Sequence, residues 1–250
     1  MKLQIFTCVA SLVSFAVLAA AAENETPLEQ LFNGKLTPTQ RVNACFELRG
    51  KADPDAIRAM SRALEDPDLL ACAADNLRVA GAVEPLQRAL SSENAQVRAA
   101  AARELGSFEK PELLEALSVA ARDENALVAT NALAGLSQYR DPVVVPYLAD
   151  LAKRGGMTGD MAIERLAQLD SAAALTIARE LMSSPQVPDK LYAMRVLGSV
   201  GDKTDLSELQ KIASSDQENL TRHDRGFGLM PPINLSRAAK AAMASIEARQ

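Results

Sequence analysis

The sequence predicts an all-α fold, an α-solenoid of about six helical hairpins, and two observations support this prediction. Ala and Leu, which favour helices, supply 45 and 33 of the 250 residues, whereas aromatic residues make up only 4% and Trp is absent. The β-branched and aromatic residues that a sheet needs are comparatively few. In addition, apolar helical stretches and short polar turns alternate along the chain with a period near 31 residues.

Charge and histidine content exclude several classes of function. The formal net charge is −5, with 27 Lys and Arg against 32 Asp and Glu, so a general nucleic-acid binder is not expected. The single histidine, His223, excludes any metal site that needs two histidine ligands, such as a zinc site built on two helical histidines. We therefore expect no metal and no cofactor.

The first 22 residues have the pattern of a secretory signal peptide. Lys2 supplies a positive start, residues 3–22 carry no charge, and Ala20, Ala21 and Ala22 provide a small-residue cleavage site before Glu23. An uncleaved transmembrane anchor is the alternative, since 20 uncharged residues could span a bilayer. We expect cleavage, a periplasmic or secreted location, and no stable membrane insertion afterwards.

Two markers define the repeat. Polar turns are centred on residues 67, 93, 124, 155, 184 and 215, at steps of 26 to 31 residues. Leucines recur at 105, 136, 166 and 197, each near the end of an apolar stretch, with a turn expected after Leu105 and after Leu197. Each period therefore holds two helical stretches. We expect a lead at 23–36 and repeats over 37–213.

Helix starts can be read from the prolines and from the apolar spacing. Thr37 and Pro38 are typical of a helix N-cap and first residue, and predict a helix to about Arg49. A second helix of the same type is expected over 68–79. Three sets of apolar residues each fall on one helical face: Leu113, Leu117 and Ala120; Val97, Ala101 and Leu105; Val128, Ala132 and Leu136.

The strings Val97–Gly106 and Ala193–Gly198 resemble the second helix of short HEAT repeats, the kind also found in phycobilisome lyases. The resemblance covers residues 38–213 and 234–249, and it implies stacked helical hairpins. Tetratricopeptide repeats are the alternative, but their period is 34 and their aromatic signature is missing. HEAT repeats serve many partners, so the resemblance implies a fold rather than one activity.

Known activities of HEAT-repeat proteins can be tested against the residues. The hydroxylases of this type use repeated His-Glu pairs for iron, and here only His223 is present. Bilin lyases need a tetrapyrrole pocket, whereas the aromatic residues after residue 22 are few and scattered. DNA glycosylases of this type need a basic aromatic groove, which the acidic balance does not favour.

One segment breaks the period. The leucine marker predicts position 228 for the last repeat, but the matching helix, 234–250, has its equivalent at Met243. About 15 extra residues therefore form an inserted loop over 214–233. Insertions in repeat proteins fall in loops, often on the binding side. The alternative is that the apolar residues of this loop cover the last repeat, which lacks a stacking neighbour.

The candidate binding residues are four in the loop and two on repeat helices: Arg222, His223, Arg225, Phe227, Arg103 and Arg195. Arg103 and Arg195 occupy equivalent positions three repeats apart, but the positions between them are Ala134 and Glu164. Because the pattern is interrupted, two interpretations remain. The arginines belong to solvated helix faces, or they line a groove that binds an acidic peptide. His223 beside Asp224 could act as a general base, yet no flanking motif supplies a nucleophile.

Cys45 and Cys72 are the two cysteines that remain after residue 22. Export would place them in an oxidising compartment, and they are 27 residues apart, close to one repeat. On equivalent helices of adjacent repeats, a disulfide can join them if the side chains face each other. Two buried free thiols are the alternative.

Taken together, these features favour a non-enzymatic scaffold or adaptor of the cell envelope. We expect it to bind a protein or peptide through the concave face of the solenoid and through the 216–233 loop. The alternative is a lyase-like or accessory enzyme that uses the loop around Arg222–Arg225.

Overall fold

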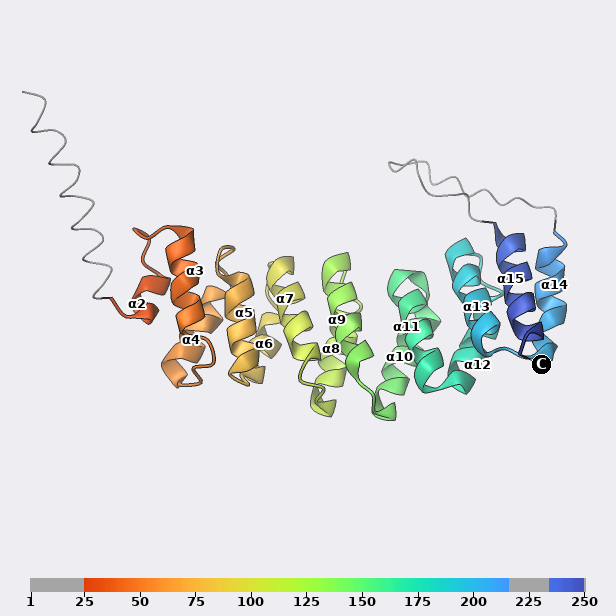
Figure 1. Ribbon diagram of the computed structural model, residues 1–250, viewed down its shortest axis with the longest axis horizontal. Coiled ribbons are helices and arrows are strands. Elements are labelled where there is room, and N and C mark those ends of the chain that lie inside the picture. The colour runs from red at the N-terminus through yellow and green to blue at the C-terminus, as the bar shows by residue number, and fades with distance from the viewer. Residues whose placement is uncertain (1–24, 216–233, 250) are drawn as a thin grey trace, which may run out of the picture. The chain divides into compact units, whose positions relative to one another are not determined.

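The computed structural model describes residues 25–215 and 234–249, and all of its regular structure is helical (Figure 1). No strand occurs within these ranges. The signal peptide expected at 1–22 and the loop expected at 216–233 lie outside the described residues. Of the helices that are described, none is both long and apolar enough to cross a membrane.

The chain divides into two compact units, residues 1–108 and 109–250. The first unit contains α2 (Pro27–Leu31), α3 (Pro38–Glu47), α4 (Pro54–Ala63), α5 (Leu70–Val79), α6 (Val83–Ala89) and α7 (Ala95–Gly106). The second contains η1 (Pro111–Leu113), α8 (Leu114–Ala120), α9 (Ala126–Gln138), η2 (Pro142–Val144), α10 (Val145–Arg154), α11 (Gly156–Leu169), α12 (Ser171–Leu181), α13 (Val187–Val200), η3 (Lys203–Asp205), α14 (Leu206–Ala213) and α15 (Leu235–Glu247).

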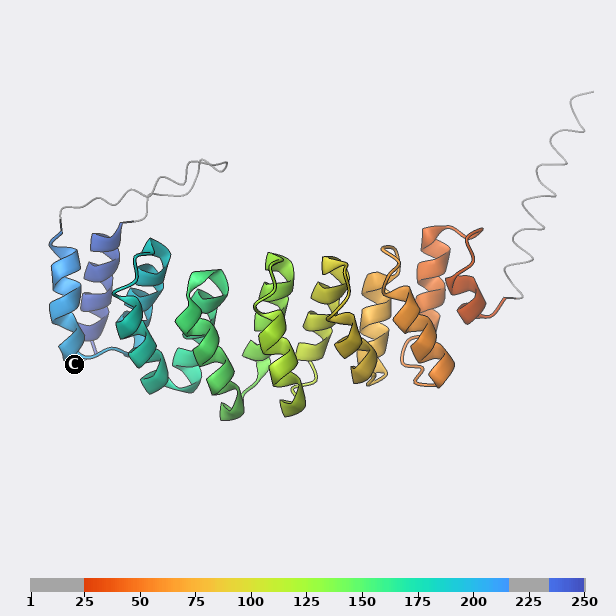
Figure 2. The same cartoon turned by 180° about the vertical axis from the view of Figure 1, so that it is seen from behind.

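Each unit is a stack of helical hairpins, the arrangement of an α-solenoid. Consecutive helices pair as α4–α5 and α6–α7 in the first unit, after a short α2–α3 pair, and as α8–α9, α10–α11, α12–α13 and α14–α15 in the second. The second helices of neighbouring hairpins also pack together, as α9, α11, α13 and α15 do in turn. Both views show the hairpin helices side by side (Figures 1 and 2). The described chain thus contains six full hairpins, as predicted.

Caps fix the phase of the repeat. Thr37 caps α3, with Pro38 at its first position and a capping box to Gln40, as predicted. The second helices α7, α9, α11, α13 and α15 follow cap positions 94, 125, 155, 186 and 234, which lie 30 or 31 residues apart except for a last step of 48. Asn94, Asn125 and Asn234 bind backbone N–H groups of their helices through the side chain.

The apolar faces predicted from the sequence form the core of the hairpins. All nine residues of the three predicted sets are buried, and most of them have no exposed surface. Because one face of each hairpin helix packs on its partner and another on the next hairpin, the small residue alanine supplies much of the core.

Three sequence predictions need correction. The helix expected over 68–79 begins at Leu70, after a turn that includes Asp66 and Pro67. In the last repeat, Met243 is only half-buried, whereas Ala242 and Ile246 are the buried residues of this part of α15. The turn expected after Leu197 is absent, because α13 continues to Val200.

Gly198 lies inside α13 and against a neighbouring helix, where a turn was expected. A Cβ at this position would lie 3.2 Å from the Cα of Ala242 on α15. The glycine therefore permits a close approach of two helices rather than ending one of them. The side chain of Arg249 donates to the carbonyl groups of Gly198 and Gly201, which satisfies backbone acceptors at the end of α13.

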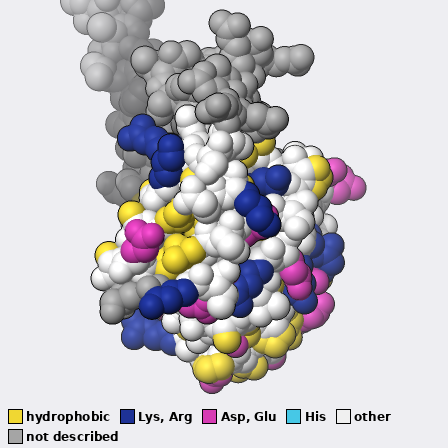
Figure 3. Space-filling model, turned by 90° about the vertical axis from the view of Figure 1, so that its right-hand side faces the viewer, with side chains coloured by type: hydrophobic (Ala, Val, Ile, Leu, Met, Phe, Trp, Pro, Cys, Tyr) yellow, Lys and Arg dark blue, Asp and Glu magenta, His cyan; other side chains and the backbone are white. Residues whose placement is uncertain are grey.

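The C-terminal end of the second unit carries charged and apolar side chains together. None of the exposed large hydrophobic side chains of the described residues belongs to α14 or α15. Lys and Arg side chains lie across this end, with hydrophobic side chains between them (Figure 3).

Candidate functional site

The exposed face of α9, α11 and α13 in the second unit is the main candidate for a functional surface. Counting from their caps at 125, 155 and 186, equivalent positions of the three helices carry exposed or partly exposed side chains. We call this surface the α9–α11–α13 face, and its principal members are Leu127, Ala134, Met157, Met161, Glu164 and Arg195. The direct packing of α9 on α11 and of α11 on α13 makes it continuous.

The N-terminal half of this face is apolar. Leu127 is 52% exposed, Met157 53% and Met161 44%, although each is a large hydrophobic side chain. Leu127 and Met157 occupy the same position, two residues after the helix cap, and Met161 lies one turn further along α11. Neighbouring exposed apolar side chains of this kind mark interaction surfaces. The flexible thioethers of Met157 and Met161 can also adapt to partners of different shapes.

The C-terminal half of the face carries charge. Arg195 Nη1 lies 2.5 Å from Glu164 Oε1, an ion pair that joins α13 to α11 without hydrogen-bond geometry. Both side chains border a groove of about 220 Å³ between the two helices, together with Gln168 and Ser199. An exposed pair of this type contributes little to stability, about 0.2 to 1 kcal/mol.

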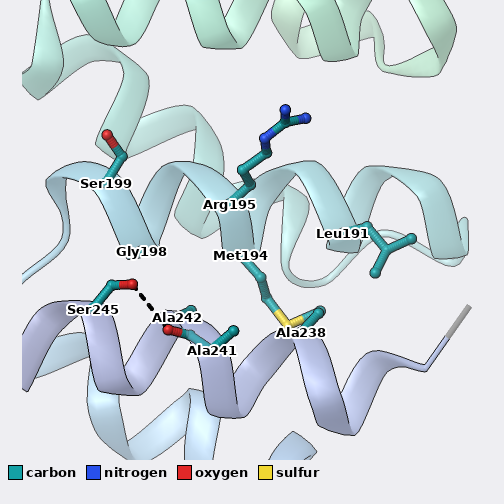
Figure 4. Close-up of a pocket in the computed structure, with 9 residues that line it drawn as sticks. All are labelled: Leu191, Met194, Arg195, Gly198, Ser199, Ala238, Ala241, Ala242 and Ser245. Atoms are coloured by element: carbon teal, nitrogen blue, oxygen red, sulfur yellow. Dashed lines mark hydrogen bonds between the residues drawn. The ribbon is translucent and has the colours of Figure 1, made fainter.

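A second groove, of about 500 Å³, lies between α13 and α15 (Figure 4). Its walls are mostly apolar or small, with Leu191 and Met194 on α13 and Ala238 and Ala241 on α15. Arg195 borders this groove as well, but its guanidinium points away from α15. Arg195 therefore stands on the ridge between the two grooves.

Buried carboxyl groups lie behind the charged half of the face. Asp160 is 2% exposed, and its Oδ1 has no hydrogen-bond partner. Asp189 is also buried, but its oxygens accept hydrogen bonds from the Ser184 hydroxyl at 2.6 Å and from the Gly156 backbone N–H at 3.3 Å. Burial, with a further effect of the Asp189 and Glu164 carboxylates, raises the pKa of Asp160 to about 7.

The turn before α11 depends on the buried Asp189. Gly155 has a φ of +66°, and a Cβ there would lie 2.9 Å from Asp189 Oδ1. Glycine is therefore needed both for the left-handed backbone and for the close approach of the carboxylate. The Arg-Gly-Gly string that the sequence identified as a turn thus has a second role, since it brings the start of α11 against α13.

The pKa of Asp160 gives a prediction on pH and stability. Its folded pKa, about 7, is above the ordinary value of 3.8, so the stability that the neutral carboxyl contributes is complete below 3.8 and is lost as pH rises through 7. We expect Asp160→Asn to melt several degrees above the wild type at pH 8 and by a clearly smaller margin at pH 5. Calorimetry at both pH values measures this, and an equal difference at the two pH values would contradict it.

The two repeat-helix arginines singled out in the sequence belong to different units. Arg103, on α7 of the first unit, places Nη2 2.7 Å from Glu104 Oε1, and Glu104 also pairs with Arg78 at 2.9 Å. Arg195 belongs to the second unit. Arg222, His223, Arg225 and Phe227 lie outside the described residues.

The structure contains the predicted disulfide between Cys45 and Cys72, with Cα atoms 6.3 Å apart. It joins α3 to α5, which are second helices of successive pairs. The buried Asn76 side chain donates to the Cys45 carbonyl at 2.7 Å and ties the same two helices. Within the described part of the chain, no group of three or more His, Cys, Asp or Glu residues is arranged to hold a metal ion.

Sequence reasoning missed the residues that make the α9–α11–α13 face distinctive. Met157 and Met161 looked like ordinary apolar helix residues, and Asp160 looked like a surface acid. The spacing from each cap could have revealed that Leu127 and Met157 are equivalent. Which flank of α11 packs on α13, and so buries Asp160, depends on the packing of the hairpins.

Comparison with known proteins supports the repeat assignment. A family model described as HEAT repeats matches residues 83–156. This stretch is similar to HEAT repeats. No curated protein matches the sequence.

Several solved structures are similar to the chain. Human deoxyhypusine hydroxylase, in complex with glycerol, shares 18% identity over 93% of this chain and 99% of its own, with a TM-score of 0.37. The Escherichia coli protein YibA shares 15% over 93% and 96%, with a TM-score of 0.47. The CpcE–CpcF complex of phycocyanin lyase from Nostoc shares 19% over 88% and 93%, with a TM-score of 0.41.

Proposed function

We propose that this chain is a non-enzymatic binding module that holds a protein or peptide on the α9–α11–α13 face. The observation that carries the proposal is the half-exposure of Leu127, Met157 and Met161 on neighbouring parallel helices. Three large apolar side chains kept in water are unfavourable unless a partner covers them. The groove between α13 and α15 extends the same surface with further apolar side chains.

Location is part of the proposal. Residues 1–22 have the signal pattern, and the disulfide between Cys45 and Cys72 is typical of oxidising compartments. We therefore propose that the protein acts in the periplasm or outside the cell as a scaffold or adaptor. N-terminal sequencing of the protein recovered from its host should begin at or within two residues of Glu23, and intact Met1 in the membrane fraction would favour an anchor.

Site-specific crosslinking tests the function. A photo-reactive amino acid at Met161, in the full chain expressed in its own host, should trap one recurring partner. The matched control is the same group at Thr176, an exposed residue of α12, a first helix of its hairpin. Equal trapping at the two positions, or no trapping at Met161, would contradict a binding role for the face.

The alternative, an accessory enzyme that uses Arg222–Arg225, makes a different prediction. Replacing Arg222, Arg225 and Phe227 together by Ala should then abolish a chemical conversion and leave crosslinking at Met161 unchanged. In the binding proposal the same triple variant weakens partner capture, because Arg and Phe are common interface anchors. Capture and turnover measured on one preparation of the triple variant distinguish the two functions.

A further inference from the structure

The charges around α11 are unbalanced, and this imbalance indicates the chemistry of the partner. Glu164, Asp160 and Asp189 lie near one another at the boundary of α11 and α13, since burial raises the pKa of Asp160 and the other two carboxylates add to this rise. Arg195 is paired with only one of these three acids, Glu164. The neighbouring Arg165 donates to Gln168 and to the Tyr139 carbonyl rather than to these acids, so the buried carboxyl groups are short of positive charge.

A second observation concerns an unpaired oxygen atom. Asp160 Oδ1 is buried without any hydrogen-bond partner, whereas Glu164 Oε1 is held in the ion pair with Arg195. Buried carboxylate oxygens without donors are costly, and a neighbouring cation would lower that cost. Asp160 and Glu164 are one turn apart on α11, so a cation over Glu164 also acts on Asp160.

The apolar side chains lie beside these acids on the same helix. Met157 and Met161 alternate with Asp160 and Glu164 along α11, and both methionines are about half exposed. A partner that covers the methionines therefore reaches Glu164 within about one turn, or 5.4 Å, along the helix.

We propose that the α9–α11–α13 face binds a peptide segment that combines apolar side chains with a lysine or arginine. The apolar side chains cover Leu127, Met157 and Met161, and the cationic group lies over α11 beside Glu164. This inference rests on the proposed function and specifies its partner. It also gives the acids of the charged half a role. A peptide with a cation is favoured over a peptide that has the same apolar side chains and no cation.

Three labelled peptides of equal length test the proposal, with the same leucines and with lysine, glutamine or glutamate at the remaining positions. Fluorescence polarisation at pH 8 and low salt should give the lysine peptide a Kd about tenfold below that of the glutamate peptide. Glu164→Gln and Asp160→Asn should each weaken lysine-peptide binding about fivefold. The control variant is Glu180→Gln, which removes an exposed acid of α12 and should change the Kd less than twofold.

The pH dependence of lysine-peptide affinity shows whether Asp160 acts through its charge or only through its place in the packing of the helices. Burial is the main cause of the raised pKa of Asp160, and Asp189 of α13 and Glu164 of α11 are the charged groups that add to it. Wild-type affinity for the lysine peptide should therefore increase between pH 6 and pH 8, as Asp160 ionises, more than that of Asp160→Asn. Equal profiles for the two proteins would overturn a role for this carboxylate.

The remaining outcomes distinguish the partner from its alternatives. If the lysine and glutamate peptides bind equally while Met161 still crosslinks a partner, the basic chemistry is wrong and the proposed function stands. If no peptide binds and Met161 traps nothing, the proposed function fails as well. If deletion of 217–232 tightens lysine-peptide binding about tenfold, this segment of the chain itself occupies the face, which overturns an external partner.

Discussion

Loss of the Cys45–Cys72 disulfide is expected to lower the free energy of unfolding by about 3.5 kcal/mol in the chain-entropy description, since the bridge closes a loop of 27 residues. The pair Cys45→Ala and Cys72→Ala removes the bridge without adding a buried hydroxyl group. Urea unfolding of this double variant and of the wild type, with and without reductant, measures the effect.

The double variant also serves as its own control. Reductant should shift the wild type to the midpoint of the double variant and should leave the double variant unchanged. Thiol counting on unfolded, unreduced wild type should find no free thiol at Cys45 or Cys72. Two free thiols, or equal urea midpoints for the oxidised and reduced wild type, would contradict a stabilising bridge.

The surroundings of the bridge explain why its loss is expected to affect α3 in particular. α3 is held to α5 by the disulfide, by the hydrogen bond from Asn76 to the Cys45 carbonyl and by the ion pair of Arg49 with Asp75 at 2.7 Å. Arg41 adds a bond to Asp68 at 2.8 Å, in the turn before α5. Arg41 also pairs with Asp66 at 2.5 Å, and the disulfide is the covalent link among these contacts, so its loss is expected to loosen α3 from α5.

The repeat could be predicted from the sequence because successive hairpins use similar helix caps, polar turns and buried leucines. Thr37 before Pro38 determines a helix start by local chemistry alone, and the polar turns at 93, 124 and 155 recur with the caps that follow them. The leucines at 105, 136, 166 and 197 are all buried. A local signal repeated at a constant interval is strong evidence for a stacked fold.

The failures occur where packing, rather than local sequence, decides the structure. Leu197-Gly198-Ser199 resembles Leu105-Gly106-Ser107, yet α7 ends at Gly106 whereas α13 continues to Val200 and places Gly198 against Ala242 of α15. Asp160 is buried because α13 packs on its side of α11, which no periodicity of α11 itself reveals. The exposure of Met157 and Met161 follows from the same packing.

Leu136 and Leu127 provide the sharpest test of which side of α9 is core and which is binding surface. Both are leucines of one helix, but Leu136 has no exposed surface and Leu127 is 52% exposed. Leu136→Ala should lower the free energy of unfolding by about 2 to 5 kcal/mol, because it removes buried methyl groups and leaves a cavity. Leu127→Ala should change it by about 0.5 kcal/mol or less.

Urea unfolding of the two variants measures the difference between their free energies of unfolding. Peptide binding then tests whether Leu127 belongs to the binding surface. Leu127→Ala keeps the fold, so any weakening of the lysine peptide by this variant reports a lost contact on the α9–α11–α13 face and not a loss of structure. Similar destabilisation by both variants would mean that Leu127 is covered in the native protein. A stable Leu127→Ala variant with unchanged peptide affinity would restrict the binding surface to α11 and α13.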